Sequence, residues 1–346
     1  MAAEASVSSP LSRLRAPSLV TALGIIFVGV IALWLVVNLV KGPSVFFEVT
    51  AIGITNGSVY ALVALGYTLV YGILEMLNFA HGDVYMVGGF LAAGVAVLFV
   101  HSGVAAFPAG LVVALMVVAA MAGTGLLGVG IERIAYRPLR NASRLAPLIT
   151  AIGVSLLLES VVQVRVSPAP VLVPSNALVP QAVIHAGSVG TPLMAVVLVV
   201  VSVLLMIALD LFTFRTQFGA AMRATAQDRE AASFMGIDID RVIMVTFLIG
   251  SALAGMGGVL FGLRFATVNF FMGFLIGIKA FTAAVIGGIG NIRGAMVGGF
   301  LLGVLESLGG GFVSTEFQDV FAFLALIVVL LVRPQGLFGE KPLERA

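Results

Sequence analysis

Four ionisable residues lie within long apolar stretches of this sequence and are its first candidates for chemistry: Glu75, Glu159, Lys279 and Glu306. If those stretches cross a membrane, each buried charge costs about 2.5 to 3.5 kcal/mol on insertion scales, so it marks a bundle interior or an aqueous path. Glu159 and Lys279 could contact the charged ends of a zwitterionic solute. Glu75 and Glu306 fit structural pairing, or a side chain that reaches the membrane interface.

A second polar group, Asn78, His81 and Asp83, separates the apolar stretches 46–70 and 84–100. These side chains could line the inner mouth of a path. They could also bond to the backbone groups that every helix end leaves unpaired. His81 and Asp83 have no third ligand nearby in the sequence, so we predict no metal site and no bound cofactor.

The most informative polar segment is residues 215–241. It is rich in alanine and other helix-forming residues and has no proline, which predicts one helix from Phe218 to Met235. Gly236 should end that helix, since glycine accepts the left-handed conformation of a terminating residue. Asp238 or Asp240 should then cap the next helix.

Composition places these residues in a membrane protein. Of the 346 residues, 60% are apolar and 10% charged, and the mean hydropathy is +1.18. Soluble domains carry about 25% charged residues. The sequence has no cysteine, which excludes disulfides, and its net charge of +2 is too small to indicate a nucleic-acid partner. We therefore predict an all-α fold, a polytopic bundle of transmembrane helices.

Apolar residues fall into ten blocks, most of them near the roughly 20 residues that a spanning helix needs. The blocks are residues 19–40, 46–70, 84–100, 107–131, 145–164, 193–212, 242–263, 274–290, 295–308 and 320–332. The last three are short enough to be half-helices, so we predict eight to ten spans. The first is longer than the roughly 7 to 15 apolar residues of a signal peptide, and we expect it to be a retained span.

Most of the 18 basic residues lie before the first block or after an even-numbered one, which predicts that both termini are cytoplasmic. The expected organisation is a cytoplasmic N-terminal segment (1–18), a single transmembrane domain (19–332) and a cytoplasmic tail (333–346). Residues 213–241 then form a cytoplasmic loop. Residues 165–191 form an outer loop, where four prolines exclude a continuous helix.

Small residues four positions apart should let helices approach closely in lipid, where the hydrophobic effect favours no particular apolar neighbour. Three such pairs are present: Gly89 with Ala93, Gly258 with Gly262, and Gly299 with Gly303.

The string from Gly66 to Phe90, with Asn-Phe-Ala-His-Gly-Asp at its centre, resembles the signature of the H-type permease subunit of branched-chain amino-acid importers. The resemblance covers roughly residues 46–339. Glu230-Ala-Ala, followed after three residues by Gly236, is similar to the loop by which permeases of ATP-binding-cassette importers contact their ATPase subunits. The usual Leu-Pro element downstream of that loop is absent.

The resemblance implies a bacterial inner-membrane transport subunit without enzymatic activity of its own. Its implied partners are two cytoplasmic ATP-binding subunits, a second related permease, a periplasmic substrate-binding protein and membrane lipid. The implied ATPase-coupling residues are Arg229, Glu230, Ala231, Ala232 and Gly236. The candidate residues of a translocation path are Asn78, His81, Asp83, Glu159 and Lys279. Leucine, isoleucine and valine are the expected cargo, while urea and short amides stay open because related permeases share much of this pattern.

Two other classes of protein deserve comparison. An ion-coupled secondary transporter would have similar spans but would not explain the segment from Glu230 to Gly236. A membrane-embedded enzyme has little support, because the sequence has three histidines and lacks metal-helix, nucleophile-elbow and phosphate-loop motifs. Any ATP hydrolysis must then take place on another chain.

Overall fold

The computed structural model describes residues 29–30, 33–101, 107–140, 142–143, 145–187 and 189–339. The chain divides into two compact units, Met1–Pro43 and Ser44–Ala346. In the first unit residues 33–41 are helical, and the Asn38 side chain donates to the Trp34 carbonyl at 2.8 Å.

Some sequence predictions fall outside the described residues. They concern the N-terminal segment 1–18, most of the first apolar block and residues 340–346 of the C-terminal tail.

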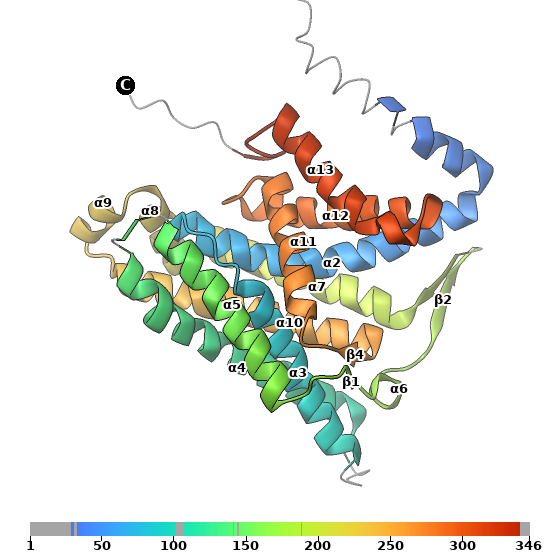
Figure 1. Cartoon of the computed structure of the whole chain (residues 1–346), viewed down its shortest axis with the longest axis horizontal. Coiled ribbons are helices and arrows are strands. Elements are labelled where there is room, and N and C mark those ends of the chain that lie inside the picture. Colours follow the sequence, from blue (N-terminus) through green and yellow to red (C-terminus); the bar gives the residue numbers. More distant parts are fainter. Residues whose placement is uncertain are drawn as a thin grey trace, which may run out of the picture. The chain divides into compact units, whose positions relative to one another are not determined.

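Helices make up almost all of the described chain from Pro43 onward (Figure 1). The long helices are α2 (Pro43–Leu74), α3 (His81–His101), α4 (Ala109–Ile131), α5 (Leu145–Arg165), α7 (Leu193–Arg215), α10 (Ile239–Phe265), α11 (Met272–Gly287), α12 (Ile292–Phe312) and α13 (Gln318–Val332). The short helical pieces are η2 (Glu132–Tyr136), η3 (Arg137–Leu139), α6 (Ser175–Leu178), α8 (Gln217–Gln227), α9 (Arg229–Phe234) and η4 (Thr315–Phe317). The strands are β1 (Val171–Leu172), β2 (Val183–Ala186), β3 (Val189–Pro192) and β4 (Thr267–Val268).

Within the described residues, 8 helical segments are long and apolar enough to cross a membrane. This confirms the all-α polytopic class and agrees with the predicted eight to ten spans. One prediction needs correction: block 295–308 is no half-helix but the 21-residue helix α12. Its glycines, Glu306 and Ser307 interrupt the apolar pattern, yet the backbone stays helical because a helix satisfies its own hydrogen bonds in lipid. Block 274–290 forms the 16-residue helix α11, and block 320–332 forms the 15-residue helix α13, which reaches spanning length only together with η4.

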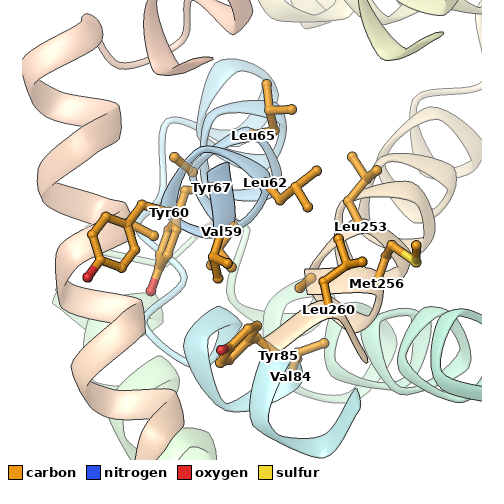
Figure 2. Close-up of a cluster of buried hydrophobic side chains, with 14 of the residues drawn as sticks. Val59, Tyr60, Leu62, Leu65, Tyr67, Val84, Tyr85, Leu253, Met256 and Leu260 are labelled. Atoms are coloured by element: carbon orange, nitrogen blue, oxygen red, sulfur yellow. The ribbon is translucent and has the colours of Figure 1, made fainter. Parts of the chain in front are cut away.

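Helix α2 forms the centre of the Ser44–Ala346 unit: 89% of its spanning window is buried, against 6% for the last span. α10 packs against α3 and α4, while α11 packs against α12 and α3. Figure 2 shows Leu62 of α2 pointing toward Leu253 and Leu260 of α10. Tyr60 and Tyr67 project from another side of the same helix. α2 therefore supplies apolar contacts to α10 and hydroxyl groups elsewhere.

Close helix contacts involve members of all three predicted small-residue pairs. A Cβ added at Gly299 would lie 2.5 Å from Cα of Ala61 in α2, and one added at Gly258 would lie 2.5 Å from the backbone nitrogen of Gly89 in α3. Real Cβ atoms do not approach so closely. The small residues therefore place α12 on α2 and α10 on α3, as the spacing predicted.

The segment 165–191 has no continuous helix, as its prolines predicted. It contains β1, α6, β2 and the start of β3; β2 pairs with β3 as an antiparallel hairpin, and β1 pairs with β4. These strands and α8–α9 lie at opposite ends of the helices in Figure 1.

Candidate docking surface and polar cavity

The polar segment between α7 and α10 forms two short helices, so the single helix predicted from Phe218 to Met235 is wrong. α8 ends where Asp228 adopts extended backbone, and α9 starts immediately after it. The Asp228 carboxylate accepts hydrogen bonds from the N–H groups of Glu230 and Ala231, at 2.9 and 3.0 Å. An aspartate that caps a new helix competes with continuation of the old one. We call residues 217–237 the docking element.

Gly236 ends α9, as the sequence predicted. Its φ is +82°, in the left-handed region, and its N–H donates to the Ser233 carbonyl at 2.9 Å. The N–H of Ile237 donates to the Ala232 carbonyl at 3.1 Å. Asp238 then caps α10 by accepting from the Arg241 N–H at 3.0 Å. The chain thus turns sharply and enters the next long helix.

The docking element exposes apolar side chains beside an apolar groove. Phe234 and Met235 are each 83% exposed. The groove has a volume of about 590 Å³, and its walls come from both short helices and the turn that follows them. Its lining residues are Gln217, Ala220, Ala221, Ala224, Gln227, Asp228, Ala231, Ala232, Met235 and Ile237. Alanines leave the floor of the groove open to a partner's side chains.

Arg229 connects the docking element to α2. Its guanidinium donates to the Ile73 carbonyl at 2.7 Å, in the last turn of that helix. Two residues later Glu75 has a φ of +53°, which is uncommon for a residue other than glycine. This hydrogen bond joins the start of α9 to the end of α2, just before Asn78 and His81.

An ion-pair network ties the start of α10 to the end of α4. Arg137 and Arg140 both donate to Asp240, and Arg140 also donates to the buried Glu132. Burial lowers the pKa of the Arg140 guanidinium from its ordinary value, while Glu132 acts in the opposite direction. Asp240 serves this network rather than capping the helix.

Asn78 and His81 are buried where α2 gives way to α3, with exposed fractions of 3% and 1%. The Tyr136 hydroxyl donates to Asn78 Oδ1 at 3.1 Å. The His81 ring lies against Gly66, where an added Cβ would overlap it, and meets the Tyr67 ring edge-on with centroids 5.0 Å apart. These contacts hold the junction of the two helices together.

Asp83 and Glu159 come together through α5. Asp83 lies in the first turn of α3, is 1% exposed and accepts a hydrogen bond from the Ser155 hydroxyl. Glu159 follows Ser155 by one helical turn, so both face the same side of α5. That side borders a cavity of about 260 Å³ between α2, α5 and α11. Its lining residues are Tyr67, Phe79, Ile152, Ser155, Leu156, Glu159, Phe274, Gly277 and Ile278. We call this space the polar cavity after Ser155 and Glu159, although most of its lining is apolar.

Lys279 lies apart from the other path candidates. Its ammonium group pairs with Glu306 of α12 and Asp319 of α13, at 2.7 Å each. It also lies 5.7 Å from the centre of the Tyr60 ring. Glu306 is only 2% exposed, and the ion pairs join α11 to the two helices that follow.

Several residues of the cavity and its surroundings were missed from the sequence. Tyr67, Tyr136 and Ser155 carry no charge, and nothing local distinguishes them from other polar residues in helices. One feature of the sequence could have indicated Ser155: it precedes Glu159 by four residues, within the part of the chain that the family resemblance covers. Asp319 gave no such signal, because its pairing with Lys279 depends on tertiary packing.

The comparisons with known proteins agree on one family. The family model described as "Branched-chain amino acid transport system / permease component" matches residues 49–330. The high-affinity branched-chain amino acid transport system permease protein LivH of Escherichia coli is 44% identical over 299 residues, which are 85% of this chain and 95% of that protein.

Two further relatives extend the comparison. The corresponding protein BraD of Pseudomonas aeruginosa is 44% identical over 301 residues, with the same two coverages. A probable LivH of Methanocaldococcus jannaschii is 31% identical over 298 residues, covering 83% of this chain and 90% of that protein. No solved structure matches the chain.

Proposed function

Because the chain belongs to the family of permease components of branched-chain amino acid transport systems, we propose that it carries leucine, isoleucine, valine or related amino acids across the membrane in an ATP-driven importer. It is a multi-pass protein of the bacterial inner membrane and a transport component rather than an enzyme. ATP hydrolysis then takes place on two cytoplasmic ATP-binding subunits.

The observation that carries this proposal is the exposed docking element. Phe234 and Met235 are apolar, yet they extend beside the groove instead of packing into the bundle. Burying a large apolar side chain gains about 1.5 to 3 kcal/mol, so such a pair favours a protein partner. We assign Arg229, Glu230, Ala231, Ala232 and Gly236 to this contact.

Arg229 offers a route from that contact to the membrane interior. An ATPase that moves α9 would act through the Arg229 bond on the last turn of α2, and so on the junction at Asn78 and His81. Asp83 lies in the first turn beyond that junction, and Glu159 faces it across Ser155. We place the path beside Asp83 and Glu159, with Asn78 and His81 supporting its inner end.

Lys279 has a different place in this proposal. Because its ammonium group already pairs with two carboxylates, Lys279 supports the packing of α11. We do not expect it to face the path directly.

The remaining partners fit other surfaces. α5 and α13 are largely exposed, with 22% and 6% of their spanning windows buried, so they offer faces to lipid or to a second, related permease. The segment 165–191, at the end of the helices away from the docking element, offers a surface to a periplasmic binding protein.

The named relatives favour amino acids over urea or short amides as cargo. A secondary transporter driven by an ion gradient is not favoured, because it has no use for an ATPase docking element.

The test is leucine uptake by proteoliposomes that contain the complete transporter. Uptake should stop on ATP depletion but persist with an uncoupler. Gly236→Pro and Glu230→Lys should each lower leucine uptake by about tenfold or more while ATP hydrolysis continues. Proline fixes φ near −65°, whereas residue 236 needs a φ of +82°. Ser143→Lys, an exposed position in the loop before α5, is the control and should retain ATP-dependent uptake. Normal uptake by both docking-element variants would remove the assignment.

A further inference from the structure

The polar cavity combines one acidic wall with several apolar ones. Ser155 and Glu159 form the polar side of α5, and Asp83 lies directly behind Ser155. Ile152 and Leu156 flank them on α5, and Phe79 with Phe274 and Ile278 of α11 complete the apolar part of the lining. The lining thus offers a carboxylate to an ammonium group and apolar side chains to a hydrocarbon chain, which are the two contacts that an aliphatic amine requires.

Buried polar atoms around this cavity lack partners within the chain. In the described residues, the Tyr67 hydroxyl has no side-chain hydrogen-bond partner although the residue is only 3% exposed and lines the cavity. Oδ1 of Asp83 and Oε1 of Glu159 are likewise without partners in this part of the chain. Buried acceptors and hydroxyls are normally paired, so these three atoms indicate a ligand.

The charge at the cavity is also unbalanced. No Lys or Arg is among the described residues that line it, whereas the carboxylate of Glu306 on the far side of α11 binds Lys279 at 2.7 Å. Uncompensated carboxylates at membrane depth are costly. A cation that enters with the cargo would restore the balance, whereas Glu306 already has the Lys279 ammonium group as its counter-ion.

We infer that the polar cavity binds the cargo amino acid through the ammonium group and the branched side chain of the cargo, and not through its carboxylate. Glu159 and Asp83 attract the ammonium group, the Tyr67 hydroxyl accepts a hydrogen bond from it, and the branched side chain packs against Ile152, Leu156 and Phe274. This inference rests on the proposed function. It predicts that the ammonium group and the branched carbon chain are both required, while the carboxylate is not.

The chain has no cysteine, so a single introduced thiol reports on the cavity. Leu156→Cys is placed in the complete transporter, without binding protein, and N-ethylmaleimide labelling of this chain is followed on a gel. The probes are 3-methylbutylamine, which has the ammonium group and branched chain, and 4-methylpentanoate, which lacks the ammonium group. Ser143→Cys, in the exposed loop before α5, is the control for general effects on reactivity.

The amine should slow labelling of Leu156→Cys about threefold once it is at roughly twice its dissociation constant. The acid should not slow it, and labelling of Ser143→Cys should be unchanged by either compound. Adding Glu159→Gln should abolish protection by the amine. If Leu156→Cys assembles poorly, Ile152→Cys on the same cavity wall replaces it.

Equal protection by both compounds, or protection that survives Glu159→Gln, would overturn the inference. An unreactive thiol in an assembled variant would also overturn it, because the cavity would then not admit aqueous solutes. ATP-dependent leucine uptake by the unaltered transporter is measured in parallel. Uptake without protection rejects this site alone, whereas loss of ATP dependence rejects the proposed function.

Discussion

The docking element exposes apolar side chains, whereas the polar cavity buries charged and hydroxyl-bearing ones. Phe234 is 83% exposed, while Asp83 is 1% exposed. Each arrangement is unfavourable for the isolated chain, and each becomes favourable with a different partner: an apolar protein surface in one case and a small cation in the other. The difference also concerns packing. The Phe234 side chain packs little against the rest of the fold, whereas Asp83 lies where α3 meets α5 and α11.

The largest effect should follow from overpacking the junction beside the cavity. Gly66→Leu would push a side chain into the His81 ring and the backbone of Gly250, and overpacking costs about 1 to 3 kcal/mol or more. We expect a large loss of monodisperse protein in size-exclusion chromatography. Gly94→Leu in α3, where a Cβ meets nothing within 4 Å, is the control. Similar yields for the two variants would show that the junction is not tightly packed.

A smaller and different effect is expected at the docking element. Phe234→Ser should leave the yield and melting temperature unchanged, but weaken co-purification with the ATP-binding subunits by about 2 kcal/mol, or roughly thirtyfold, if the ring is buried in the complex. Phe317→Ser, which alters an exposed phenylalanine before α13, is the matched control. Equal loss of the ATPase in both variants would contradict a specific docking role.

The smallest effect should come from a single hydroxyl group at the junction. Tyr136→Phe removes the hydroxyl that donates to Asn78 Oδ1 and to the Leu77 carbonyl without changing the ring, and a hydrogen bond of this kind contributes about 1 kcal/mol. The melting temperature should fall by about 2 to 4 °C, with ATPase association unchanged. Tyr71→Phe, in the last turns of α2, provides the reference. No difference between the two variants would mean that the Tyr136 bond does not stabilise the junction.

The docking element was largely predictable because its signals are local. Gly236 and Asp238 act within a few residues of their own positions, and the structure confirms both. Asp228 was missed because helix propensity was summed over the whole segment, while one capping side chain was enough to divide it.

The polar cavity was predictable only in part. The spans follow from composition, and single charges such as Glu159 are conspicuous in apolar sequence. Their partners are not, because Asp83 and Ser155 are 72 residues apart and Lys279 and Glu306 are 27 apart. Helix packing decides whether a charged side chain pairs with a counter-ion or faces a cavity. The sequence indicates that packing only through small residues such as Gly258 and Gly299.

The most direct test of the account is the accessibility of the docking element. Met235→Cys, in this cysteine-free chain, is treated with a membrane-impermeant maleimide in sealed vesicles of each orientation. The account predicts labelling only from the cytoplasmic side, slowed about tenfold or more when the ATP-binding subunits are assembled, as a contact worth about 1.4 kcal/mol requires. Labelling from the outside, or a rate that the ATP-binding subunits do not change, would contradict it.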